Sequence, residues 1–150
     1  MKIYLEEGQA LNLELNEKLQ RTAEFVLESE NVCGENAEIS LTLVSPEEIK
    51  ELNRDYRGVD SVTDVLSFPQ FESVDDMPKE GEICLGDVVI CRDKVVEQAE
   101  EFGHSYEREF VYLFVHSMFH LMGYDHMQED EKAVMRNKEE EVMNRMDLRR

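Results

Sequence analysis

The segment from Ser105 to Met122 constrains the fold more strongly than any other part of the sequence. Its periodicity predicts a helix, and apolar side chains lie on nearly every face of that helix. Because such a helix must be covered on all sides, we expect it at the centre of the domain, with the other elements packed around it. Gly123 is expected to end the helix, since glycine is the usual residue at the left-handed position of a C-terminal cap.

Patterns on either side of this helix predict a sheet covered by helices. Helical periodicity or capping signals mark residues 14–28, 46 to about 54, 92–102 and 129–145. Strand signals mark residues 3–5, 37–43, 63–68 and 87–91, and the first two strands are expected to pair. The acidic stretch 70–81 is expected to be a flexible surface loop. We therefore predict a single domain over residues 1–150 of the α/β or α+β class, with one mixed sheet.

Charge and composition exclude two classes of protein. The chain carries 35 acidic and 16 basic side chains, a formal net charge of −19, so it repels polyanions and anionic membranes. This excludes a protein that coats nucleic acid non-specifically. The longest mainly apolar run, Phe110 to Met122, falls short of the roughly 20 residues of a membrane span. The first residues turn acidic before an apolar signal region develops, so we expect a cytoplasmic protein without a membrane partner.

The cysteines give no sign of a disulfide or of a cysteine metal site. Cys33, Cys84 and Cys91 are odd in number and form neither a CxxC pair nor a zinc-ligand spacing. We expect them to be reduced, mostly buried thiols.

Three of the four histidines fall within eleven residues, in the pattern HxxxHxxGxxH. His116 and His120 are four residues apart on the predicted central helix, so both imidazoles leave the same face. A turn at Gly123 would bring His126 to the same ion. Three imidazoles suit one zinc and leave a fourth position open, which is typical of a catalytic site at the end of the helix. Alternatively, the first two histidines are hydrogen-bonded core residues and His126 caps a turn, but so apolar a helix disfavours unpaired imidazoles.

The same histidine spacing occurs in metzincin peptidases, where the first histidine is followed by a glutamate that acts as general base. Ser117 occupies that position here, so a metalloprotease-like hydrolase is disfavoured. Three neutral imidazoles leave the full positive charge on the ion, which favours an anionic substrate. Phosphodiester cleavage is the reaction that fits best.

Five segments together resemble the YbeY endoribonuclease family, in order and at similar spacing. They are Leu52-Asn53, Tyr56-Arg57, Thr63 to Pro69, Leu85 to Cys91, and His116 to His126. The metal-site segment departs from the family pattern by Ser117 in place of glycine and by Phe119. Ser117 is small, so we expect the buried helix to tolerate it.

The resemblance implies a metal-dependent endoribonuclease that prefers single-stranded RNA. It implies action in the maturation of small-subunit ribosomal RNA and in ribosome quality control, with ribosomal proteins or ribosome-bound factors as further partners. The metal would be zinc, held by His116, His120 and His126. Arg57 matches the functional arginine of the family, and its guanidinium is suited to bind a phosphate in bidentate geometry.

Several assignments stay open at this level. Asp64 and Asp87 are candidates for the general base, or strand-end residues that accept backbone hydrogen bonds. A non-catalytic ribosome-assembly factor would need a fourth zinc ligand, for which His104 or Cys91 is the candidate. The following basic residues are expected either to form a local positive cleft with the zinc or to scatter over the surface: Arg54, Arg57, Arg92, Lys94 and Arg108. The acidic stretches 72–82 and 129–141 are expected to be solvated faces, or surfaces that dock a basic ribosomal protein.

Overall fold

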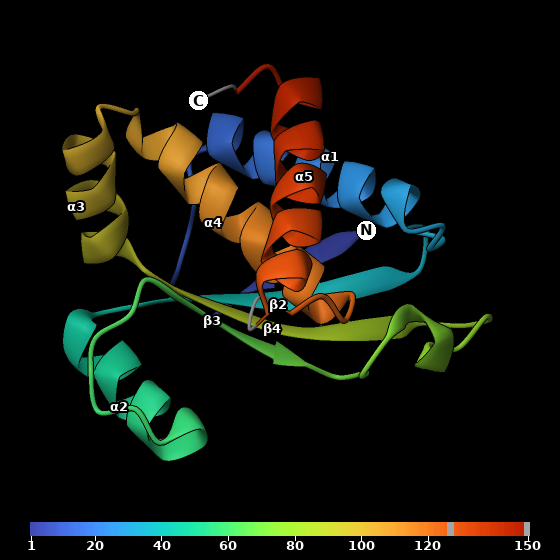
Figure 1. Ribbon diagram of the computed structural model, residues 1–150, viewed down its shortest axis with the longest axis horizontal. Helices are drawn as coiled ribbons and strands as arrows, with labels where there is room; N and C mark the ends of the chain where they lie inside the picture. Colours follow the sequence, from blue (N-terminus) through green and yellow to red (C-terminus); the bar gives the residue numbers. More distant parts are fainter. Residues whose placement is uncertain (126–127, 149–150) are drawn as a thin grey trace.

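The computed structural model describes residues 1–125 and 128–148, and within them the chain forms one four-stranded sheet and five α-helices (Figure 1). The strands are β1 (Lys2–Leu5), β2 (Ala37–Val44), β3 (Val65–Pro69) and β4 (Ile83–Cys91). The helices are α1 (Leu13–Ser29), α2 (Pro46–Arg57), α3 (Arg92–Phe102), α4 (Tyr106–Leu121) and α5 (Glu129–Arg145). None of the helices in these ranges is long and apolar enough to cross a membrane.

The sheet is mixed, which confirms the predicted fold class. Its strand order is β1-β2-β4-β3. Strands β1, β2 and β4 run parallel to one another. At the edge of the sheet β3 pairs with β4 in antiparallel orientation, with Ser67 opposite Val88. The predicted pairing of the first two strands is present, with Leu5 opposite Leu41. Among the described strands β3 pairs only with β4, so it forms one edge of the sheet.

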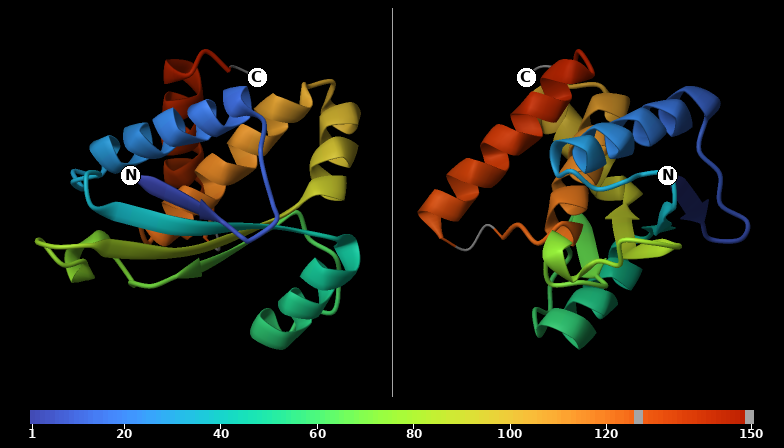
Figure 2. Two further views of the ribbon diagram at one scale, coloured as in Figure 1. Left: turned by 180° about the vertical axis from the view of Figure 1, so that it is seen from behind. Right: turned by 90° about the vertical axis from the view of Figure 1, so that its right-hand side faces the viewer.

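Helices cover the two faces of the sheet unequally. Figure 2 shows α1, α3, α4 and α5 on one face and α2 alone on the other. As predicted, α4 is the central helix, and Phe110, Phe114 and Phe119 are fully buried in the larger core. A smaller core beneath α2 contains Ile49 and Leu66.

The second helix is longer than the sequence predicts. It begins as expected, because the Ser45 hydroxyl accepts a hydrogen bond from the backbone N–H of Glu48 and the Glu48 side chain bonds back to the backbone of Ser45. It continues past Arg54 to Arg57 and ends at Gly58, which adopts a left-handed φ of 71°. This extension makes Arg57 a residue of the last helical turn.

The stretch predicted as a flexible loop is more ordered than its composition suggests. It contains a 3-10 turn over Val74–Asp76, and the side chain of Met77 joins the core. The fourth strand also begins at Ile83 rather than Asp87, with a register shift where Ile39 pairs with Gly86. Gly86 has φ 139° and lies so close to the backbone oxygen of Phe68 that no β-carbon fits there. A glycine of this kind hides the continuity of a strand from sequence analysis.

The cysteine prediction was partly wrong. Cys91 is buried, whereas Cys33 and Cys84 are exposed. All three are free thiols, as expected.

Candidate functional site

Two of the predicted metal ligands meet at the end of the central helix. His116 and His120 lie one turn apart on α4, and their Nε2 atoms are 3.2 Å apart. The two rings are nearly perpendicular, at 83°. Two nitrogens bound to one tetrahedral zinc at about 2.0–2.1 Å each would lie about 3.3 Å apart. The observed separation therefore fits two ligands of one ion.

Hydrogen bonds on the opposite side of each ring fix which nitrogen faces the site. His116 Nδ1 lies 2.5 Å from Oε2 of Glu139, and His120 Nδ1 lies 2.9 Å from the backbone oxygen of Tyr124. A carboxylate and a carbonyl oxygen only accept, so both Nδ1 atoms donate. In a neutral imidazole with this tautomer, Nε2 carries the lone pair that a metal ion requires. Histidines that bind metals through Nε2 usually have such a hydrogen-bond acceptor at Nδ1.

The third predicted ligand, His126, lies outside the described residues. Within residues 1–125 and 128–148, no three histidine, cysteine or acidic side chains form a metal-binding group. The chain does turn toward the site after α4, where Gly123 adopts φ 102°. A β-carbon at Gly123 would lie 2.7 Å from the backbone oxygen of Glu72, so only glycine fits this turn. The turn delivers the Tyr124 carbonyl to His120.

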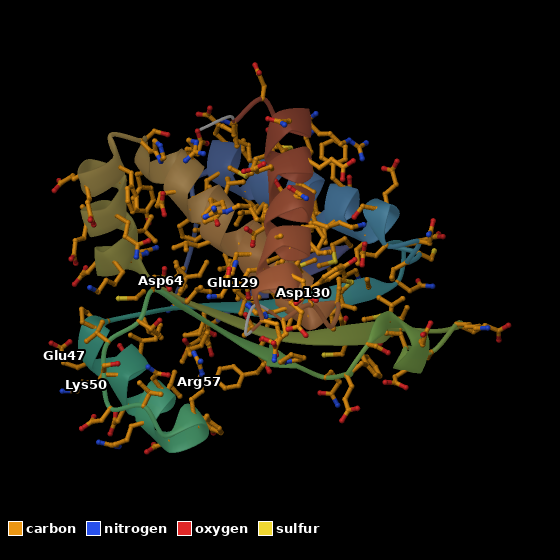
Figure 3. The ribbon with its side chains drawn as sticks, in the orientation of Figure 1. Glu47, Lys50, Arg57, Asp64, Glu129 and Asp130 are labelled. Atoms are coloured by element: carbon orange, nitrogen blue, oxygen red, sulfur yellow. The ribbon has the colours of Figure 1, made fainter. Side chains whose placement is uncertain are left out.

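A groove of 770 Å³ brings Arg57 together with both histidines. One side comes from the end of α4 and the turn that follows it, and the other comes from β3 and the end of α2. Figure 3 labels Arg57 at the end of α2 and Asp64 where the chain enters β3. The groove is also lined by the carboxylates of Asp64, Glu72 and Asp125, so its described lining holds more acidic than basic side chains. A mainly acidic lining repels a phosphate, so a bound cation would be needed to make the groove attractive to one.

The two general-base candidates occupy different places. Asp64 lines the groove, but its Oδ1 accepts from the backbone N–H of Val65 at 2.8 Å and its Oδ2 accepts from Nε2 of Gln98 at 3.1 Å. These contacts fix the start of β3 and connect it to α3. Asp87 accepts a hydrogen bond from the Ser40 hydroxyl and is not among the residues that line the groove.

The prediction of a local positive cleft was wrong. Of the five basic residues proposed for it, only Arg57 lines the groove with the histidines. The other four contact groups elsewhere: Arg54 contacts Asp55 and Glu51, Lys94 contacts Glu97, Arg92 contacts the carbonyl of Ala10, and Arg108 contacts His104. They belong to three different helices, and each finds a partner close to its own position.

Neither candidate for a fourth zinc ligand lines the groove. His104 Nδ1 lies 2.6 Å from Nη1 of Arg108, near the start of α4. Cys91 is fully buried in the core beneath α2, and this burial raises the pKa of its thiol, which keeps the sulfur protonated. The structure therefore does not bring either side chain to the histidines.

Sequence analysis missed Glu139. The acidic stretch 129–141 was predicted to be a solvated face, yet Glu139 is only 3% exposed. Its Oε1 accepts a hydrogen bond from the Tyr112 hydroxyl at 3.0 Å, while Oε2 contacts His116. The signal was present in the spacing, because Glu139 follows Met135 by four residues and precedes Val142 by three, on the apolar face of α5.

Ser117, which departs from the family pattern, is accommodated by a partner on the edge strand. In the sequence it lies between the two histidines, and its side chain is fully buried. Its hydroxyl lies 2.6 Å from the hydroxyl of Ser67 on β3. Ser117 thus connects α4 to β3, the strand that lines the groove.

Comparisons with known proteins show which family the chain resembles and where its fold recurs. The profile of the family described as Endoribonuclease YbeY matches residues 4–147. A protein of that name from Caldanaerobacter subterraneus is 52% identical over 137 residues, covering 87% of this chain and 86% of the relative. One from Thermoanaerobacter sp. is 48% identical, covering 94% and 92%. The solution structure of TM1509 from Thermotoga maritima matches with a TM-score of 0.60 and 30% identity, covering 97% of this chain and 91% of that one.

Proposed function

Since the chain belongs to the YbeY endoribonuclease family, we propose that it is a zinc-dependent endoribonuclease that cleaves single-stranded RNA. We place its action in the maturation of small-subunit ribosomal RNA and in ribosome quality control, in the cytoplasm, with ribosomal proteins or ribosome-bound factors as partners. The observation that carries this proposal is the convergence of the Nε2 atoms of His116 and His120 in a groove that Arg57 also lines.

One zinc ion per chain would be held by His116 and His120, with His126 as the third ligand. Two observations support this site: the Nε2 separation of 3.2 Å, and the hydrogen-bond acceptors that hold both Nδ1–H groups. When bound, zinc supplies a Lewis acid that polarises a phosphoryl oxygen and lowers the pKa of water. Neither His104 nor Cys91 lines the groove, which favours a catalytic over a purely structural role for the site.

Arg57 binds and orients the phosphodiester in this scheme. Its guanidinium is exposed at the end of α2, on the side of the groove opposite the histidines. A planar guanidinium donates two parallel hydrogen bonds to phosphate oxygens and stabilises negative charge that develops during cleavage. Arg54, one turn earlier, already contacts Asp55 and Glu51, so Arg57 is the residue of this helix that serves the substrate.

Tyr56 accounts for the preference for single strands. Its side chain is 70% exposed beside Arg57, and its ring meets Phe68 edge-on with centroids 5.2 Å apart. The aromatic side chains that line the groove, Phe71 and Tyr124, pack against the core instead. An unpaired base stacks on an exposed aromatic ring, whereas a paired base is not available for this contact. The chain has a net charge of −19 and therefore lacks a general electrostatic attraction for RNA phosphates. Stacking of a base on Tyr56 would supply part of the binding free energy instead.

The experiment that tests this function measures zinc content and cleavage of single-stranded RNA on four proteins: wild type, His120→Ala, Arg57→Ala and Arg54→Ala. We expect wild type to carry about one zinc and cut RNA, His120→Ala to lose both properties, and Arg57→Ala to keep zinc and lose cleavage. Arg54→Ala is the matched control on the same helix and retains both. Wild type that binds zinc and never cuts would instead support a non-catalytic assembly factor.

A further inference from the structure

Both carboxylate oxygens of the buried Glu139 contact side chains of α4, the helix that carries His116 and His120. Glu139 extends from α5 to α4, where Oε2 contacts His116 Nδ1 at 2.5 Å and Oε1 accepts from the Tyr112 hydroxyl at 3.0 Å. Tyr112 and His116 are one turn apart on α4. One carboxylate thus fixes two successive turns of the helix, and it fixes the ring of His116 with them.

Burial makes this arrangement expensive unless positive charge lies nearby. Glu139 is 3% exposed, and the side chains that donate to it are a phenol and an imidazole. Removing a carboxylate from water is unfavourable even after relaxation of the protein. Arg108 and Arg136 line a cavity of 270 Å³ that Glu139 also borders, on the side away from the groove. Lys132 and Arg136 line a second pocket, of 420 Å³, which both His116 and Glu139 also border. A zinc ion bound at His116 Nε2 would add a further positive charge, connected to the carboxylate through the imidazole.

We propose that Glu139 is a positioning residue that orients His116 and strengthens its bond to the metal, an inference that rests on the proposed metal site. A carboxylate that accepts from Nδ1–H makes the imidazole a better donor at Nε2 and locks the tautomer that a metal requires. The Nδ1 atoms of the two histidines have different acceptors, because that of His116 contacts a carboxylate and that of His120 contacts the neutral carbonyl of Tyr124. Glu139 therefore acts on one ligand through its charge, and α5 becomes part of the metal site without contacting the metal.

The decisive comparison is between Glu139→Gln and Glu140→Gln. Glutamine at position 139 retains an oxygen that accepts from His116 and an amide that donates to Tyr112, but it lacks the charge. Glu140 is its exposed neighbour on α5 and serves as the matched control. We expect zinc affinity, measured by competition with a chromophoric chelator, to fall about 10- to 100-fold in E139Q and to stay at the wild-type value in E140Q. Tyr112→Phe, which keeps the charge, should weaken zinc binding less than E139Q does.

Unfolding of the zinc-free proteins separates positioning from a general effect on the fold. The zinc-free form of E139Q should be at least as resistant to urea as zinc-free wild type, because glutamine removes a buried charge. Long-range nitrogen–proton NMR spectra of zinc-free wild type should show His116 protonated at Nδ1. Wild-type zinc affinity in E139Q overturns the proposal. So does a loss of affinity matched by an equal loss of stability in the zinc-free protein. The proposed nuclease function fails by a different result, which is zinc-loaded wild type that does not cut RNA.

Discussion

The hydroxyl oxygen of Ser117 lies 2.6 Å from that of Ser67, so a residue between the two histidines is bonded to the strand that lines the groove. The two partners differ in burial, since Ser117 is fully enclosed and Ser67 is partly exposed beside the groove. Removing one partner therefore has a different cost from removing the other.

We expect Ser67→Ala to lower the free energy of unfolding by about 1–3 kcal/mol, because it leaves the enclosed Ser117 hydroxyl without this partner. Ser117→Ala should cost less, since water can reach the remaining hydroxyl of Ser67. Urea unfolding of both variants and of the double variant measures these differences. Equal losses for the two single variants would show that burial does not decide the effect.

Gly123→Ala should impair both stability and zinc binding. The new β-carbon would meet the backbone oxygen of Glu72 at 2.7 Å, so the turn must shift and move the Tyr124 carbonyl away from His120. Gly103→Ala is the control, because its φ of 68° is also left-handed but no atom lies within 4 Å of the new β-carbon. The control should lose only about 1–2 kcal/mol of stability and keep its zinc affinity, as urea unfolding and chelator competition would show.

Tyr56→Ala should weaken binding of single-stranded RNA by at least about fivefold, since a stacked base contributes about 1–3 kcal/mol. Tyr56→Phe keeps the ring and should bind as wild type does. Phe102→Ala removes another exposed aromatic side chain, at the end of α3, and serves as the control. Fluorescence anisotropy with a labelled oligonucleotide measures the dissociation constants. Equal binding by Tyr56→Ala and wild type would remove the stacking contact from the proposed site.

RNA binding should depend only weakly on salt. Arg57 is the one basic side chain among the described residues that line the groove, and a single phosphate contact to single-stranded nucleic acid gives a slope of about −0.7 in a plot of log affinity against log salt. We expect Arg57→Ala to reduce this slope and Arg54→Ala to leave it unchanged. Titrations with a labelled oligonucleotide at several salt concentrations give the slopes, and a wild-type slope several times steeper would require further basic contacts.

Sequence patterns predicted the elements whose signals are local. The apolar surface of α4 and the capping box of Ser45 are written in neighbouring residues, and both appear as expected. The start of β4 was missed because Gly86 interrupts the pattern, and its tight contact with Phe68 is visible only when the strands pair.

The site was predictable to the extent that its parts lie on one helix. His116 and His120 share a face of α4, so spacing alone brought them together. Glu139 comes from another helix, and its acidic neighbours concealed that it lies on the buried face of α5. The prediction that five basic residues form one cleft failed for the same reason, because their shared charge does not indicate which face of its helix each residue occupies.

The contact between Glu139 and His116 has a consequence for the stage of synthesis at which the chain could bind a metal. The ribosome adds α4 and both of its histidines before it adds the residue that orients one of them. At the proposed metal site, a nascent chain that has only just completed α4 would hold its histidines without this support and would bind metal weakly. Full affinity would then arrive once α5 has emerged and packed, so we expect loading with metal to follow the folding of α5.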